Sequence, residues 1–246
     1  MLVAAALVPD TALLVPGAAG TASVLDGLRS AALHAVAHVV ALVGTGTVVV
    51  VAPGPAHREL AGTVLPSLGA AGVPDHLLGW PVRPVALPGR GSTDPSVPSS
   101  VALHLLTRAG RTDGLRVVEV TSTQAPRELS GLGQALVADG PTALVVVGSG
   151  SGRHGPDAPL ADDPRAPAFD AGVLADLADA GPSARARIAA LDPGLSEELA
   201  VRGRAPWQVL AGAAEDRPLR AQVLAASVEL GAQHGVLVWE PVEDAG

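Results

Sequence analysis

The sequence predicts an α/β protein in which a central, mostly parallel sheet is flanked by helices on both faces and closed by a C-terminal hairpin. Short runs of Val, Ala and Leu alternate with longer segments of helical periodicity, which is the pattern of βαβ units. The runs are apolar throughout, as expected of strands that are buried on both faces. No linker-like composition divides the 246 residues, so we expect residues 1–246 to form one domain.

The first four predicted strands cover residues 2–7, 47–52, 115–121 and 143–147. The fourth is followed by the sequence GSGSG, in which glycine allows the backbone to turn sharply and to pass close to a ligand. Parallel strands end at one edge of a sheet, and ligands of open α/β sheets bind there. We therefore expect the loops at 9–11, 53–57 and 148–154 to converge on one concave pocket.

The segments between and after these strands are predicted to be helical. Thr21 or Ser23 is expected to cap the first helix, and Ser99 or Ser100 the second. Residues 79–100, rich in Pro, Gly and Ser, are expected to form a long surface loop near the site. We expect Trp207 to be buried and to anchor the last helix. The predicted helices end at about 43, 107, 138, 180, 191, 202 and 214, and the hairpin pairs 221–230 with 236–240.

The composition excludes several classes of function. The chain has no cysteine, which excludes disulfides, thiolate nucleophiles and sulfur-ligated metals. All 16 basic residues are arginine, so Schiff-base chemistry on lysine is excluded. A net charge of −8 without a basic stripe argues against a nucleic-acid partner. We expect a cytoplasmic protein that binds a small molecule and no membrane, as a monomer or a homodimer.

Three strand-end loops each carry a polar residue that could bind a ligand, namely Asp10, His57 and His154. Two imidazoles and one carboxylate form the ligand set of facial-triad non-haem Fe(II) sites. The alternative is that these are ordinary polar loop residues. A further alternative is a nucleophilic pair of Ser149 or Ser151 with His154, although the glycine–serine run is out of register with the G-x-S-x-G motif.

Four stretches of the chain together resemble an actinobacterial family of class III extradiol ring-cleavage dioxygenase, subunit-B-like proteins. They are MLVAAALVPDTALLVPGAAG, VVVGSGSGRH, APLADDPRAPAFDAGVLADLA and LDPGLSEELAVRGRAPWQVLAGAA. The superfamily also contains the Memo-like proteins. The resemblance implies an α/β fold, and active enzymes that open catechol-type rings with O₂. In such enzymes two histidines and a glutamate hold Fe(II), and another histidine acts as acid and base.

Carried onto this chain, the resemblance gives His154 the acid–base role. We expect Asp157, Asp162 or Asp163, in the loop that follows, to orient its ring. The two ligand histidines fall at Asp10 and Gly54, with His57 three residues after the glycine. Three functions therefore stay open: a divergent ring-cleaving oxidoreductase, a metal-free Memo-like binding or scaffold protein, and a serine hydrolase. The residues implied for the metal are Asp10, His57 and Glu229, with Glu240 as second choice for the carboxylate, and those for the substrate are Gly54, Ser149, Ser151 and Arg153.

Overall fold

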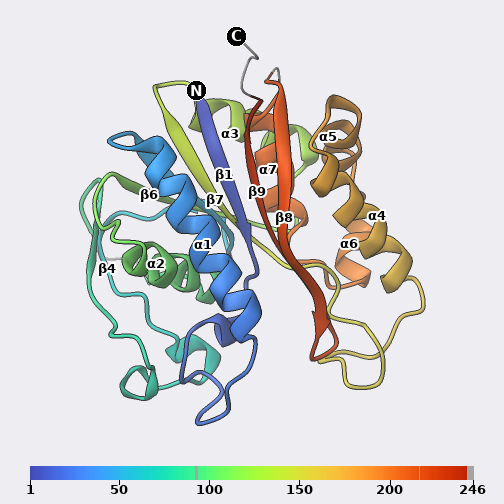
Figure 1. Ribbon diagram of the computed structural model, residues 1–246, viewed down its shortest axis with the longest axis horizontal. Coiled ribbons are helices and arrows are strands. Elements are labelled where there is room, and N and C mark those ends of the chain that lie inside the picture. Colours follow the sequence, from blue (N-terminus) through green and yellow to red (C-terminus); the bar gives the residue numbers. More distant parts are fainter. Residues whose placement is uncertain (92–93, 216, 243–246) are drawn as a thin grey trace.

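The computed structural model describes residues 1–91, 94–215 and 217–242. A seven-stranded sheet of order β3-β6-β2-β7-β1-β9-β8 runs through the molecule (Figure 1). Its four central strands in sheet order β6, β2, β7 and β1 are parallel. The predicted fold class is therefore confirmed. The parallel strands are β1 (Leu2–Val8), β2 (Thr47–Pro53), β6 (Leu115–Val120) and β7 (Thr142–Val147).

Antiparallel strands complete both sides of the sheet. β3 (Arg58–Glu59) pairs with β6, and β9 (Ala232–Pro241) pairs with β1 and with β8 (Leu219–Glu229). The closing hairpin was predicted, but with a connection over 231–235. The turn is instead Leu230–Gly231, with φ of 52° and 71°, which is the pair of positive angles that a type I′ turn requires.

Helices cover both faces of the sheet, and each face has its own apolar core. One face carries α1 and α2, and the other carries the helices from α3 to α7 (Figure 1). Successive residues of the parallel strands point alternately into the two cores, as the pleat requires. The helices are α1 (Asp26–Val43), α2 (Val97–Arg108), α3 (Pro126–Leu136), α4 (Ala166–Asp179), α5 (Pro182–Ala189), α6 (Pro193–Glu198) and α7 (Arg204–Ala213).

α1 is 18 residues long and apolar enough in composition to cross a membrane. Its apolar side nevertheless lies on the sheet, where Ala32, Ala35, Val36 and Val39 are fully buried. α1 therefore packs on the sheet as one of its covering helices. The predicted side-chain cap is wrong, because the helix begins after Leu25, which is in the left-handed conformation, and no side chain caps the first turn.

The stretch predicted as one long loop contains regular structure. β5 (Val85–Leu87) pairs with β4 (Gly62–Val64) in a separate two-stranded sheet. α2 then begins at Val97, after Ser96, whose side chain accepts the N–H of Ser99. Three-residue strands carry too little periodicity to be detected in a sequence. The earlier helix start agrees with Pro98, since proline is favoured in a first turn. Short 3₁₀ turns occur at Ala12–Leu14, Gly69–Ala71 and Asp75–Leu77.

Candidate functional site

A groove follows the carboxyl ends of the four parallel strands. One part of it, the β1/β7 half, has a volume of about 600 Å³ and is lined by residues that follow β1 and β7. The other part, the β2/β6 half, has a volume of about 620 Å³ and is lined by residues at the ends of β2 and β6. The two halves adjoin each other, because they share the lining residues Val97, Pro98, Leu160, Ala200 and Arg202.

The convergence predicted for the strand-end loops is thus confirmed for parts of all three. Asp10 and Ser149 line the β1/β7 half, and Gly54 lines the β2/β6 half. His57 and His154 are not among the residues that line either half. The loops therefore meet at one edge, but the two histidines on which the sequence argument relied lie outside the groove.

A buried polar cluster forms the inner wall of the β1/β7 half. Ser149 Oγ lies 3.1 Å from His234 Nδ1 and accepts the backbone N–H of Asp10 at 3.4 Å. All three residues are at least nine-tenths buried. The Asp10 carboxylate in turn pairs with Arg202 Nε at 2.5 Å. We refer to Asp10, Ser149 and His234 as the polar cluster.

Burial of the imidazole lowers the pKa of His234 from its ordinary value of 6.5, while the Asp10 and Glu229 carboxylates act in the opposite direction. At pH 7 the ring is therefore neutral, with one nitrogen that donates and one that accepts. A neutral imidazole beside a serine hydroxyl can exchange hydrogen bonds with a ligand hydroxyl without placing a charge in the groove.

Sequence reasoning missed His234 because two nearby glycines, Gly231 and Gly235, indicated a loop. In the structure β9 begins at Ala232 and continues through both His234 and Gly235, because each is paired with a residue of β8. The available indication was the alternation of His234 with Val236 and Val238, which all point to the same face of the sheet and are all buried.

The residues implied as metal ligands are only partly brought together. Asp10 and Glu229 line the β1/β7 half, but His57 is exposed and does not line the groove. Within the described part of the chain, no three His, Cys, Asp or Glu side chains are grouped so that they could hold a metal ion. Asp10 is also already paired with Arg202. The Fe(II) ligand set implied by the resemblance does not fit this arrangement.

Position 54 could not accommodate a ligand side chain either. A Cβ atom placed on Gly54 would lie 2.5 Å from the Cβ of Glu119, which is fully buried. Glu119 is held in place by Arg58 at 2.7 Å, by the N–H of Ser96 at 2.7 Å and by the hydroxyl of Ser99 at 2.8 Å. The space next to Gly54 is thus filled by a fixed carboxylate.

His154 lies on the other side of the loop that follows β7. The ring nitrogen Nε2 is 2.6 Å from Oδ2 of Asp170, and the backbone N–H of His154 donates to the carbonyl of Gly231 at 3.0 Å. Asp170 is nearly fully buried and also accepts the N–H of Ser151 on both oxygens. Burial raises the pKa of Asp170, and the hydrogen bonds from His154 and Ser151 partly oppose this. The pair joins the loop to α4.

The carboxylates expected to orient His154 have other partners. Asp162 accepts the N–H of Gly155 at 2.7 Å, and Asp163 pairs with Arg165 at 2.7 Å. Asp163 has a pKa lowered to about 2 by this arginine. Asp157, the third candidate, has no interaction with His154 in the described structure. The expectation was wrong because α4 begins at Ala166 and brings a helix residue, rather than a loop residue, to the imidazole.

The remaining candidate residues stabilise the loop. Ser151 Oγ donates to the carbonyl of Leu199 at 2.6 Å, and Arg153 Nη1 donates to the carbonyl of Ala161 at 2.9 Å. Neither residue lines the groove. No Ser–His154 pair therefore forms among the described residues; the pair that does form is Ser149 with His234.

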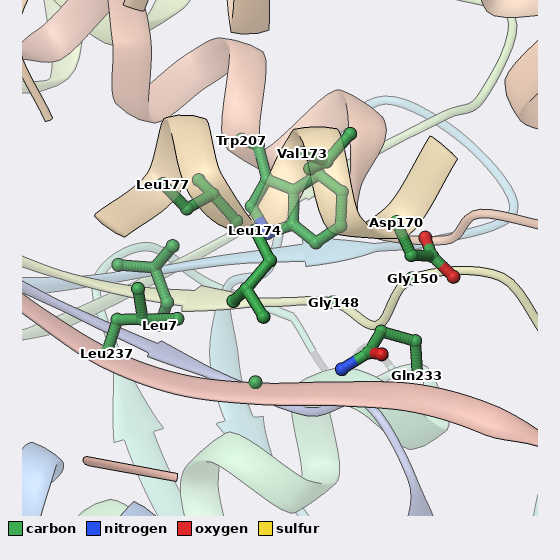
Figure 2. Close-up of a pocket in the computed structure, with 11 residues that line it drawn as sticks. Leu7, Gly148, Gly150, Asp170, Val173, Leu174, Leu177, Trp207, Gln233 and Leu237 are labelled. Carbon is green, nitrogen blue, oxygen red and sulfur yellow. The ribbon is translucent and has the colours of Figure 1, made fainter. Parts of the chain in front are cut away.

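A second, much smaller cavity lies between the sheet and the helices α4 and α7. Figure 2 shows it enclosed by apolar side chains of α4, including Val173 and Leu177, with Trp207 beside them and Asp170 at one end. Its free volume is about 20 Å³, roughly the space of one water molecule. This void is too small for a substrate. Trp207 is 5% exposed, so its predicted burial is confirmed.

Comparisons with known proteins support the fold alone. No protein-family model and no curated protein matches the chain. Several solved structures are similar to the chain, and one of them is an uncharacterized protein JW3007 from Escherichia coli K12, with a TM-score of 0.52 at 15% sequence identity. The match covers 96% of this chain and 99% of that one. The shared fold thus extends over nearly the whole of both chains, and the resemblance to ring-cleaving dioxygenases stays a prediction.

Proposed function

We propose that this protein binds a small, largely apolar hydroxy compound in the groove, with the ligand hydroxyl at the polar cluster, and that binding needs no iron. One observation carries the proposal. Asp10, Ser149 and His234 form a buried, hydrogen-bonded group in the wall of a groove lined otherwise mainly by apolar side chains. Small-molecule sites have this composition, with a few polar groups fixing the orientation of an apolar ligand.

The charges at the cluster favour a hydroxyl over an anion at this end of the ligand. Asp10, Glu229 and Arg202 all line the β1/β7 half, and Arg202 is paired with Asp10. The Glu229 carboxylate is therefore the charge that would repel a bound anion. The neutral His234 supplies a hydrogen-bond donor or acceptor but no positive charge. An alcohol or phenol can donate to a carboxylate and accept from the cluster, and so satisfies both kinds of group.

The ring-cleavage activity implied by the resemblance is not what this geometry favours. Position 54 supplies no donor and has no space for one, and His57 lies outside the groove. Metal–ligand distances near 2 Å tolerate little displacement. The protein is best understood as a divergent member of such a fold, whose groove is retained and whose ligand positions are changed.

Hydrolysis is the second candidate, because Ser149 and His234 are within hydrogen-bond distance. The N–H groups of Gly148, Gly150 and Ser151, however, already donate within the protein. They are therefore not free to stabilise a developing oxyanion. Such stabilisation is usually the largest contribution to acyl-transfer catalysis. This makes Ser149 a binding residue in our proposal.

Calorimetric titration with phenol, catechol and benzyl alcohol tests the proposal. It compares protein treated with a chelator and protein loaded with Fe(II) under anaerobic conditions. We expect equal affinities in the two samples, and binding about tenfold weaker in Ser149→Ala and His234→Gln, as for one lost hydrogen bond. His57→Ala is the matched control and should bind as the wild type does. Binding that requires iron, or that survives both cluster substitutions, would contradict the proposal.

An ester substrate separates the second candidate from the first. Turnover of p-nitrophenyl acetate that disappears in Ser149→Ala would establish hydrolysis, whereas our proposal expects no turnover above that of this variant.

We also propose that the protein works in the cytoplasm, since a chain without cysteine gains nothing from an oxidising compartment. Fractionation of the source cells tests this.

A further inference from the structure

The β2/β6 half of the groove contains polar groups that the proposed function does not use. Ser196 lines this half and is 2% exposed, yet its hydroxyl has no hydrogen-bond partner among the described residues. A buried polar group without a partner costs free energy, and native proteins rarely leave one without a reason. The oxygen is enclosed in this structure, but because Ser196 lines the groove, rotation about its Cα–Cβ bond would present the hydroxyl to a ligand.

The chain between α6 and α7 brings Ser196 close to the start of α7. Val201 donates its N–H to the carbonyl of Ser196 at 2.8 Å, and Ala200 has a φ of 55°. An alanine in the left-handed region is strained and requires support from its surroundings. This turn ends α6 and places Ser196, Ala200 and Ala205 in the same wall of the groove.

The N-terminus of α7 points into this wall without a cap. Its N-cap residue is Gly203, which has no side chain to accept the first N–H groups. Arg204 and Ala205, the first two residues of this ten-residue helix, both line the β2/β6 half. Gly203 donates its own N–H to Ser149 and Pro206 has none, so the uncapped N–H groups of this turn are those of Arg204 and Ala205. Together with the positive end of the helix dipole they favour an anion at such a position.

The guanidinium of Arg204 adds a positive charge without a carboxylate partner in the described structure. Arg204 is 1% exposed, and its contacts are Gln208 Oε1 at 2.7 Å and the carbonyls of Ser122 at 2.5 Å and Gln124 at 3.2 Å. All of these acceptors are neutral. Burial lowers the pKa of Arg204, and the carboxylate of Asp192 partly opposes this. Buried charges are normally paired, so an anion in this half would complete the arrangement.

We propose that the β2/β6 half is a binding subsite for an oxyanion, a carboxylate or phosphate group carried by a small organic compound. Ser196 Oγ and the N-terminus of α7 bind the oxygen atoms, and Arg204 supplies the compensating charge. Arg202 also lines this half, and Glu197 is the one carboxylate among its described lining residues. The further step, that one ligand spans the groove from this subsite to the polar cluster, rests on the proposed function.

Ser196→Ala is the most informative variant. Its hydroxyl makes no hydrogen bond in the described structure, so the substitution should leave the unfolding temperature of the free protein unchanged or slightly higher. The probes are inorganic phosphate and benzoate, each compared with chloride at equal ionic strength, with calorimetric titration for the dissociation constants. We expect at least one oxyanion to raise the unfolding temperature of the wild type. Its binding should be about tenfold weaker in Ser196→Ala, as for one lost hydrogen bond to a charged group.

Two further variants control for charge and for location. Glu197→Gln removes the carboxylate from the same half and should tighten oxyanion binding, whereas Ser149→Ala changes the other half and should not affect it. Arg204→Met, where it folds, should abolish binding.

Equal dissociation constants for Ser196→Ala and wild type, or no effect of either oxyanion beyond that of chloride, would overturn the subsite. Oxyanion binding without any binding of hydroxy compounds would instead refute the proposed function and leave the subsite standing. A preference between the two probes identifies the group as phosphate or carboxylate.

Discussion

Removing the indole of Trp207 should be among the most destabilising single changes in this protein. The side chain is 5% exposed and closes the small cavity shown in Figure 2. A buried tryptophan removes about 150–250 Å² from water, and truncation of large buried aromatic residues costs about 3–5 kcal/mol. In a chain of this length each kcal/mol lowers the unfolding temperature by about 2–4 °C. We therefore expect Trp207→Ala to lower it by roughly 6–20 °C.

A contact with Gly203 turns this expectation into a test of the packing itself. A Cβ atom on Gly203 would overlap with the six-membered ring of Trp207. The backbone of Gly203, with φ −77° and ψ −17°, suits alanine, so the cost of Gly203→Ala is steric. Overpacking of this kind costs about 1–3 kcal/mol. In the Trp207→Ala background the obstacle is gone, and the same substitution should cost close to nothing.

The assay is a double-mutant cycle measured by urea unfolding and circular dichroism. Gly131→Ala serves as the matched control, because a Cβ at this exposed helical position meets no atom within 4 Å. It should be neutral or stabilising in both backgrounds. An equal cost for Gly203→Ala in the presence and absence of the indole would refute the inferred contact.

Three further predictions follow from buried ionisable groups. Burial lowers the pKa of both His104 and His234 below 6.5, so the unfolded chain binds protons more readily. The free energy of unfolding should be highest above pH 6.5 and fall below it, by up to about 1.4 kcal/mol per pH unit for each histidine. His104→Gln should reduce this dependence of the unfolding free energy on pH, measured by urea titrations at pH 7.5, 6.5 and 5.5. The same dependence in the variant and the wild type would contradict the account. Glu119→Ala should cost about 1–3 kcal/mol, because it leaves the half-buried Arg58 and Ser96 and the buried Ser99 without their shared acceptor. A midpoint close to that of wild type would show that these groups find water. His154→Ala should cost about 1.5–3 kcal/mol by removing a hydrogen bond to the buried Asp170 carboxylate, and binding in the groove should be unchanged; lost binding at unchanged stability would restore the acid–base role.

The sequence was most informative where one local preference was dominant. The valine-rich run of β7 was located to within one residue, because β-branched side chains bounded by Gly and Pro favour a strand. The start of α1 could not be predicted, since it depends on a left-handed Leu25 that no sequence pattern indicates.

The candidate site was predictable in its location but not in its members. The loops at the strand ends do meet, as the topology of parallel sheets requires. His234 was missed because its strand is held through Gly235 by the neighbouring β8, a tertiary effect. The partner of His154 was assigned to the nearest loop carboxylates, whereas Asp170 lies 16 residues away on a helix. Local proximity in sequence was a poor guide to which side chains meet.

The contact between Gly54 and Glu119 makes these two positions mutationally inseparable. Any side chain at 54 requires a smaller residue at 119, yet Glu119 also bonds the first turn of α2 through Ser96 and Ser99. Each single change therefore passes through a destabilised intermediate, whichever comes first. A library meant to give the groove a new specificity should hold this pair fixed and diversify Leu160, which lines both halves and is 45% exposed.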